Sequence, residues 1–286
     1  MKPSAVVTSD SERQFYDTQY AQFLALPDHA LRIDRKVLEG NLDNPSHPFY
    51  ERRWLYRASM QALESEPLAG KQVLDYGCGP ADFGLWMATE GARVTLLDLS
   101  PAAIELGLKR AQASNVSVRG VAADASSLSM MGTAEFDIVF ACAALHHTLK
   151  YPGAVDELVR IMKPGARLVL CETWGGNPLL NTARKLHAAM IGEAAEQGEE
   201  IIMSHAELQV LSPYFSDVRV ETKNLFAMAK RLLRGRFENS WARATVRTLE
   251  GIDRAILAVA PPLRNWCGEA VITARRCGHA PPPARP

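Results

Sequence analysis

The sequence lacks an excess of charge of either sign, because its 32 lysine and arginine residues balance 32 aspartate and glutamate residues. A net charge near zero gives no overall attraction to nucleic acid or to an anionic membrane, although local charged patches can still form. No run of 18 or more apolar residues occurs. We therefore expect no nucleic-acid partner and no transmembrane segment.

The five cysteines lack the spacing of a disulfide framework or a zinc site. They contain no CxxC pair, and three of them lie in apolar stretches typical of a protein core. The first residues, MKPSAVVTSDSERQ, lack the apolar centre of a signal peptide. These features favour a reducing compartment, so we expect a soluble cytoplasmic protein that holds no metal.

The chain has enough apolar residues for a large core, since 47% of its 286 residues are hydrophobic and 22% are charged. Five short runs rich in Val, Leu and Ile are too continuously apolar to have a solvated face, and they indicate buried strands. These runs are 71–76, 92–99, 116–123, 136–143 and 166–173. Helical patterns fill the gaps, most clearly over 101–113, where Ser100 suits the cap. The pattern predicts a doubly wound α/β core over 67–176.

The segments on either side of this core have a different character. Residues 1–66 carry two helical patterns rich in aromatic residues, 15–26 and 49–63, and we expect them to form a lid or extension. Aromatic residues of such a lid could exclude water from a site, or simply pack against the sheet.

Residues 177–276 are expected to complete the sheet and to cap a substrate site. Strand patterns over 217–225 and 269–276 enclose more than forty residues that look helical, which we interpret as an inserted cover. The last residues, 277–286, are rich in proline and are expected to be disordered.

The stretch VLDYGCGPADFG, residues 73–84, places an acid and a glycine turn between a strand and a helix. Such a turn presents free backbone N–H groups at the positive end of a helix, and glycines let a ligand approach closely. Dinucleotide enzymes use a similar turn for pyrophosphate. Asp75 would repel a pyrophosphate but could hold an ammonium group, so a cationic ligand is favoured.

Two further acids end the next two strands of the predicted sheet. Asp98 stands 23 residues after Asp75, where an acid can bind the two hydroxyls of a ribose. Asp124, in AADAS, could meet the exocyclic amine of an adenine. One molecule satisfies all three acids: an adenosine that carries an amino-acid ammonium and a sulfonium.

The motifs VLDYGCG, LLDLS, AADAS, FDIVFACAALHH and MKPGARLVL together resemble the class I S-adenosylmethionine-dependent methyltransferases, in the small-molecule group. The resemblance covers about 70–175 in order and spacing. It implies a Rossmann-like, seven-stranded, mostly parallel sheet, with S-adenosyl-L-methionine as cofactor and a small-molecule acceptor that is apolar or a secondary metabolite. The cofactor-binding residues that it implies are Asp75, Tyr76, Gly77, Cys78, Gly79, Asp98, Leu99, Asp124, Ala125 and Ala141.

Candidate residues for the acceptor side are less specific. His146 and His147 follow the fourth strand and could take a proton from an acceptor hydroxyl or amine, although paired histidines also serve structural roles. Methyl transfer from a sulfonium is downhill, so alignment alone can suffice. The candidates for lining the substrate are Tyr16, Tyr20, Glu172 and Trp174.

Three other functions stay open at this point. A methyltransferase acting on RNA or protein would favour an Asn/Asp-Pro-Pro-aromatic motif after the fourth strand, where this sequence has ACAALHH. An NAD(P)-dependent oxidoreductase would have no use for Asp75, and no Tyr-x-x-x-Lys pair follows the fourth strand. A scaffold could also bind the cofactor without catalysis.

The basic stretch KRLLRGR, residues 230–236, has three interpretations. It could be a solvated face over an apolar underside, a contact with a membrane surface, or a cap that admits a lipid-like or anionic substrate. The oligomeric state is not specified by the sequence.

Overall fold

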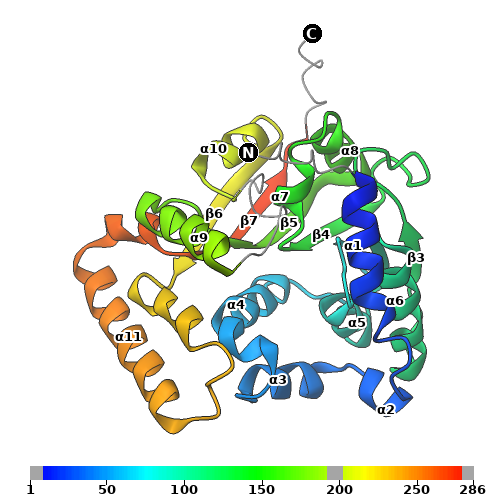
Figure 1. The fold of residues 1–286 in the computed structure, drawn as a ribbon. Coiled ribbons are helices and arrows are strands. Elements are labelled where there is room, and N and C mark those ends of the chain that lie inside the picture. Colours follow the sequence, from blue (N-terminus) through cyan, green and yellow to red (C-terminus); the bar gives the residue numbers. More distant parts are fainter. Residues whose placement is uncertain (1–8, 192–201, 279–286) are drawn as a thin grey trace, which may run out of the picture.

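The computed structural model describes residues 9–191 and 202–278. The tail expected to be disordered therefore lies largely outside the described residues. A seven-stranded sheet crosses the molecule in the order β3-β2-β1-β4-β5-β7-β6, with helices on both faces (Figure 1). The strands are β1 (Gln72–Tyr76), β2 (Arg93–Asp98), β3 (Arg119–Ala122), β4 (Phe136–Cys142), β5 (Met162–Thr173), β6 (Phe215–Lys223) and β7 (Glu269–Arg276).

Only β7 runs against its neighbours, because it pairs antiparallel with both β5 and β6. The four pairings among β1 to β5 are parallel. The predicted fold class, a mostly parallel doubly wound sheet that ends in an antiparallel hairpin, is confirmed. Apolar cores lie on both faces of the sheet, one around Trp86 and Phe140 and the other around Phe136 and Leu170.

The helices between the strands cover these two cores. Ser100 caps the helix after β2, since its hydroxyl accepts a hydrogen bond from the Ala103 N–H group at 3.1 Å. The capped helix has the bounds that the sequence predicted. The helices within the core domain are α5 (Asp82–Thr89), α6 (Pro101–Ala113), α7 (Leu145–Thr148) and α8 (Ala154–Ile161).

The N-terminal segment is helical, as expected, and lies beside the carboxyl ends of the central strands (Figure 1). Its first helix contacts α6, and its last contacts β5 and β7. The elements are α1 (Ser9–Ala21), α2 (Asp28–Leu31), α3 (Arg35–Asp43), the 3-10 helix η1 (Pro48–Arg52) and α4 (Arg53–Leu63).

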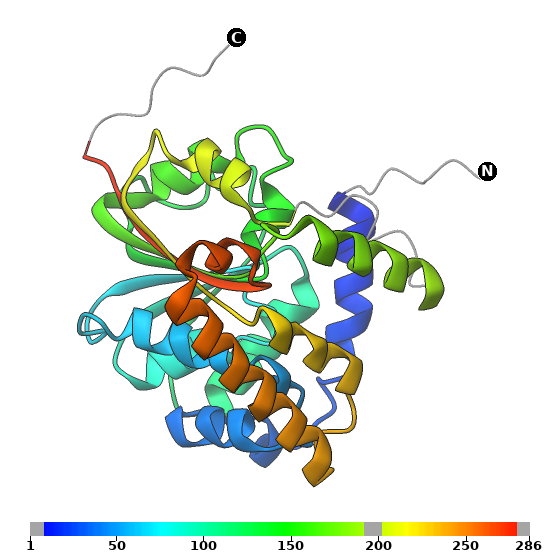
Figure 2. The same cartoon turned by 90° about the vertical axis from the view of Figure 1, so that its left-hand side faces the viewer.

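The C-terminal third adds helices around β6 and β7. The predicted helical insertion between these strands is present, and its long helix α11 (Ser240–Val259) packs beside η2 (Phe226–Leu233) (Figure 2). The helix ends before Pro261, which has no N–H group to donate. No helix within residues 9–191 and 202–278 is both long and apolar enough to cross a membrane. The remaining helices are α9 (Pro178–Ile191), α10 (His205–Leu211) and η3 (Pro261–Trp266).

Candidate functional site

A cavity of about 360 Å³ lies at the carboxyl ends of β1, β2 and β4, under helix α1. In open α/β sheets this edge is where ligands bind. A larger hollow of about 800 Å³ runs along β6 and α11, but none of the candidate residues for cofactor or acceptor lines it. The smaller cavity is therefore the candidate site.

The glycine turn after β1 forms one wall of the cavity. Gly77 and Gly79 adopt φ angles of 66° and 49°, in the left-handed region that favours glycine. A Cβ atom on Gly77 would lie 2.4 Å from the Cβ of Ala144, and one on Gly79 would lie 2.8 Å from the Tyr20 hydroxyl. The turn thus brings its backbone close to the cavity because these positions carry no side chain.

Two buried carboxylates face this turn. Asp75, 3% exposed, accepts a hydrogen bond from the Gly84 N–H group at 2.9 Å through Oδ2. Asp98, 9% exposed, accepts from Gly79 at 2.8 Å and from Ser100 at 2.9 Å, one bond to each oxygen. An ionised carboxylate has about four acceptor positions. Each group therefore keeps positions for a ligand.

The charges of these carboxylates have no cationic partner within the described chain. Their neighbour Asp82 pairs with Arg110 at 2.7 Å, but no ion pair forms at Asp75 or Asp98. Burial raises the pKa of Asp75, and the nearby carboxylates of Asp98 and Asp82 raise it further. Burial also raises the pKa of Asp98, although the backbone hydrogen bonds that this carboxylate accepts act to lower it. Buried, unpaired negative charge is costly. The cavity consequently favours a ligand with positive charge and hydroxyl groups.

Asp124 lies at the far end of the cavity, after β3. Its Oδ1 accepts from the backbone and hydroxyl of Ser126, at 2.9 and 2.7 Å, and its Oδ2 accepts from the Ser9 hydroxyl at 2.6 Å. Although burial acts to raise it, these bonds lower the pKa of Asp124. The carboxylate is therefore ionised and already tied to helix α1.

Helix α1 covers the cavity, and its side chains hold it to the protein on two sides of the cavity. Asp17 accepts from the Ser100 hydroxyl at 2.5 Å and from the Ala102 N–H group at 3.1 Å, at the start of α6. Glu12 accepts from Lys150 at 2.8 Å, beyond α7. Tyr16 and Tyr20 of this helix line the cavity, and burial raises the pKa of Tyr20. These contacts hold α1 over the cavity, as a lid would be held; the lid itself stays a prediction.

The two histidines after β4 have different positions. His147 lines the cavity, whereas His146 lies behind it and its Nδ1 is 2.7 Å from Oε2 of Glu172. The two imidazole rings are 4.2 Å apart. Burial, then His146 and Lys150, lower the pKa of His147 to about 3. His147 is therefore neutral at physiological pH and can accept a proton.

The cavity gathers most of the residues that the sequence singled out. Four of them lie behind its wall instead: Ala141, His146, Glu172 and Trp174. Side chains alternate along extended backbone, so Glu172 near the end of β5 and Trp174 just after β5 share one face of the sheet while Thr173 occupies the other. The Trp174 indole N–H group donates to the Asn265 carbonyl at 3.1 Å, away from the cavity. Those that line it are Tyr16, Tyr20, Asp75, Tyr76, Gly77, Cys78, Gly79, Asp98, Leu99, Asp124, Ala125 and His147.

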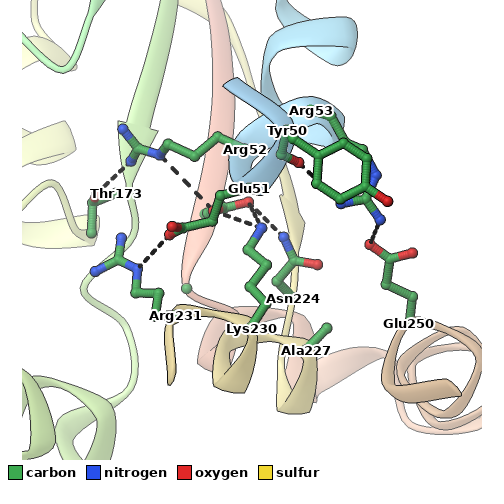
Figure 3. Close-up of polar contacts among 12 residues, drawn as sticks. Tyr50, Glu51, Arg52, Arg53, Thr173, Asn224, Ala227, Lys230, Arg231 and Glu250 are labelled. Carbon is green, nitrogen blue, oxygen red and sulfur yellow. Dashed lines mark hydrogen bonds and ion pairs between the residues drawn. The ribbon is translucent and has the colours of Figure 1, made fainter. Parts of the chain in front are cut away.

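Sequence reasoning expected 49–63 to belong to a lid but did not single out the residues with which η1 and α4 line the cavity. Phe49, Arg52 and Tyr56 all line the cavity. Their spacing of three and four residues puts them on one face of a helix, which is the signal that could have found them. Arg52 donates a hydrogen bond to the Thr173 hydroxyl at 2.8 Å (Figure 3). This side of the cavity thus contains a partly exposed positive charge, since the Arg52 side chain is 20% exposed.

Comparison with known proteins supports a family assignment. A family model described as a methyltransferase domain matches residues 73–165. The demethylmenaquinone methyltransferase of Clavibacter sepedonicus is 35% identical over 37% of this chain and 42% of its own length. The malonyl-[acyl-carrier protein] O-methyltransferase of Enterobacter lignolyticus is 27% identical over 76% of this chain and 89% of its own length. The chain spans about half the length of the demethylmenaquinone methyltransferases that it matches, 42% and 54%.

Solved structures share the fold at low sequence identity. The [4+2]-cyclase SpnF superposes with a TM-score of 0.57 at 19% identity, over 95% of this chain and 97% of its own. A phosphoethanolamine N-methyltransferase 2 of Haemonchus contortus, in complex with S-adenosyl-L-methionine, gives 0.57 at 17% identity, over 96% of this chain and 61% of its own. The match over 73–165 identifies a methyltransferase domain, and the order of the motifs and the topology of the sheet agree with the resemblance to the class I S-adenosylmethionine-dependent methyltransferases.

Proposed function

We propose that this protein transfers a methyl group from S-adenosyl-L-methionine to an oxygen, nitrogen or carbon atom of a small-molecule acceptor. The observation that carries the proposal is the pair of buried carboxylates, Asp75 and Asp98, that face the glycine turn in one cavity without a cationic partner in the described chain. The printed names of several relatives, including O-methyltransferases of ubiquinone biosynthesis, favour an oxygen acceptor.

The residues present fit the cofactor. Asp98 has acceptor positions left for the ribose hydroxyls, Asp75 can face the ammonium group, and Asp124 with Ala125 borders the place of the adenine. When bound, the cofactor supplies an electrophilic methyl group on a sulfonium. Attraction between that cation and the carboxylates is strong because the site is buried.

The other cavity residues position the acceptor and exclude water. Helix α1 closes the cavity with Tyr16 and Tyr20, which keeps solvent from the reacting atoms. His147 is neutral and can accept a proton from the acceptor hydroxyl or amine. Glu172 holds His146 against the His147 ring, so the pair is fixed in orientation.

The fold alone does not decide the reaction, because one structural neighbour of nearly full coverage is named a cyclase. Binding of the cofactor and its consumption must therefore be measured separately. The cysteines among the described residues are free thiols, which supports our further proposal of a cytoplasmic location.

The first experiment measures thermal melting with S-adenosylhomocysteine, NAD and NADP. Only S-adenosylhomocysteine should raise the Tm, by a stabilisation of about 2.7 kcal/mol at a hundred times its Kd. Asp98→Ala should abolish the shift. Asp137→Ala is the control: its carboxylate accepts from Lys163 and Gln72 at the other end of the sheet, so the shift should persist.

The second experiment incubates the protein with methyl-labelled cofactor and fractionated small-molecule extracts. Label in a small molecule, together with released S-adenosylhomocysteine, supports the proposal. Label found only in RNA or protein would assign the activity to a macromolecular substrate. Binding of S-adenosylhomocysteine without any methyl transfer would favour a role like that of the cyclase.

A further inference from the structure

A cluster of basic side chains lies next to the cavity, at the acceptor end. We call it the cation cluster; its members are Arg52, Arg184, Lys230, Arg231 and Arg234. Two carboxylates, Glu51 and Glu269, accompany these five cations. Figure 3 shows Glu51 with Arg52, Lys230 and Arg231. The cluster joins η1, α9 and η2, which are far apart in the sequence.

The two carboxylates are occupied by two of the cations. Glu51 accepts from Arg234 at 2.7 and 3.1 Å, in a bidentate pair. Glu269, fully buried, pairs with Lys230 at 3.0 Å, and it also accepts from the Asn224 amide at 2.5 Å. Lys230, 1% exposed, has its charge matched by this contact. These pairs account for Lys230 and Arg234.

The other three guanidinium groups have no carboxylate within hydrogen-bond distance in the described parts of the chain. Arg231 Nε is 3.9 Å from Glu51, and Arg52 Nε is 4.0 Å from Glu269. Arg184 donates only to the Trp174 and Gly268 carbonyls and to the Asn181 side chain. The Nε atoms of all three arginines are buried and have no hydrogen-bond partner.

Five cations thus share two carboxylates, and the three arginines without a close carboxylate contact repel one another. Burial, then Arg231 and Arg52, lower the pKa of Arg184 to about 10. Burial and Arg52 likewise lower the pKa of Arg231. Such an arrangement is costly to fold unless a ligand compensates it, because buried donors and charges need partners. An anion is the ligand that satisfies charge and donors together.

The cluster reaches the cavity through Arg52. This residue lines the cavity together with Tyr56 and Cys142, and its guanidinium group also reaches Thr173. Figure 3 shows the guanidinium groups of Arg52 and Arg231 on the same side of the cluster, toward Thr173 and away from Asn224. A molecule in the cavity could therefore extend an anionic group to these arginines.

We propose that the acceptor molecule carries an anionic oxyacid group, a carboxylate or a phosphate, and that Arg52 and Arg231, with Arg184 beside them, bind it. This inference rests on the proposed methyl transfer, since it assigns the chemical class of that acceptor. A purely structural network would match its charges internally, as Lys230 and Arg234 do.

The first test measures binding without turnover. Sodium benzoate, phenyl phosphate and neutral benzamide are added to the full-length protein, alone and with S-adenosylhomocysteine, at constant ionic strength set with sodium chloride. We expect benzoate or phenyl phosphate, but not benzamide, to raise the Tm. A carboxylate and a phosphate are thereby distinguished. Equal effects of all three compounds, or none from either anion, would overturn the proposal.

Variants locate the anion. Arg231→Gln should weaken anion binding about ten- to hundredfold, the range expected for a lost hydrogen bond to a charged group, and Arg231→Lys should restore part of it. S-adenosylhomocysteine should still raise the Tm of Arg231→Gln, because Arg231 does not line the cavity. Arg247→Gln is the control, since it removes an exposed positive charge from α11 outside the cluster. Undiminished anion binding in both Arg231→Gln and Arg184→Gln would refute the assignment.

A turnover test uses small-molecule extract separated on an anion-exchange resin at pH 8. The fraction that accepts labelled methyl groups should be retained by the resin, and phosphatase treatment should abolish its activity only if the anion is a phosphate monoester. If only the unretained fraction were labelled, the proposal of an anionic acceptor would be refuted, whereas the proposal of methyl transfer would be supported. If the protein neither bound S-adenosylhomocysteine nor labelled any molecule, the proposed function would be refuted instead. The Tm data with benzoate and phenyl phosphate would still decide whether the cation cluster binds an anion.

Discussion

Substitution of Gly77 by alanine tests the geometry of the cofactor turn. The residue has a φ angle of 66°, where a side chain costs about 1–2 kcal/mol. The new Cβ atom would lie 2.4 Å from the Cβ of Ala144, which cannot rotate away because it is fixed to the backbone. Displacing that backbone should cost a further 1–3 kcal/mol or so, as overpacking does. Together these terms give a loss of about 2–5 kcal/mol.

The measurement is thermal unfolding with and without S-adenosylhomocysteine. For a chain of this size the loss corresponds to a Tm lower by roughly 4–10 °C, and the shift caused by S-adenosylhomocysteine should disappear with the turn. Gly251→Ala is the matched control: this glycine lies in α11 with nothing within 4 Å of a new Cβ, so alanine should stabilise the helix by about 0.5–1 kcal/mol. If Gly77→Ala melted like the wild type, the described turn would be refuted.

Three further perturbations report on the lid and the histidines. His147 has a pKa of about 3 when folded against 6.5 when unfolded, so the unfolded state binds more protons between these values and stability falls as pH drops. Urea unfolding should show that the free energy of unfolding of the wild type falls by about 2 kcal/mol from pH 7.5 to pH 5, and that this loss is missing in His147→Gln. The same pH dependence in both proteins would mean that His147 is not held neutral. Glu172→Ala should cost about 1.5–3 kcal/mol by removing the acceptor at His146, with Glu172→Gln less harmful; equal effects would exclude a role for that hydrogen bond. Asp17→Ala should release α1 and speed trypsin cleavage at Arg13 severalfold, with slower cleavage restored by Asp17→Asn; an unchanged rate would show that these bonds do not hold the lid.

The sheet could be predicted from the sequence because its strands are local patterns. Continuous burial marks β1, β2 and β4, and each end of these strands lies within one residue of the expected bound. The start of β5 was less predictable: it begins at Met162 and includes MKPG, since Met162 pairs with Phe136 before the register shifts. Such irregular pairing depends on the partner strand, which the local pattern does not contain.

The meeting of two acids at one edge of the sheet could be predicted for the same reason, and their binding to the cofactor stays a prediction. Asp75 and Asp98 are placed by the ends of parallel strands, which meet at one edge of the sheet. The acceptor side depends on docking between distant segments. Whether His146 or His147 faces the cavity is decided by the contact with Glu172, 26 residues later along the chain. A pattern of sequence cannot specify that choice.

The basic stretch 230–236 shows how tertiary contacts override a local interpretation. A solvated face was one of three interpretations of these residues, and Arg234 does remain largely exposed. Lys230, in contrast, is buried on Glu269 at the first position of β7. The 3-10 helix η2 thus turns part of its charge inward, toward the end of the sheet where the cavity lies. The interpretation as a cap for an anionic substrate now has specific residues that support it.

The opposite signs of charge at the two ends of the cavity give the site a physical means to sort its ligands. Asp75 and Asp98 attract a cation at the glycine turn, whereas Arg52 presents positive charge at the other end. Each end repels the ligand suited to the other, and in a buried site this repulsion is much stronger than in water. A cationic methyl donor and an anionic acceptor would then bind in one relative orientation, with the methyl group of the sulfonium facing the acceptor atom beside His147. Alignment of this kind lowers the barrier to transfer without requiring a strong base.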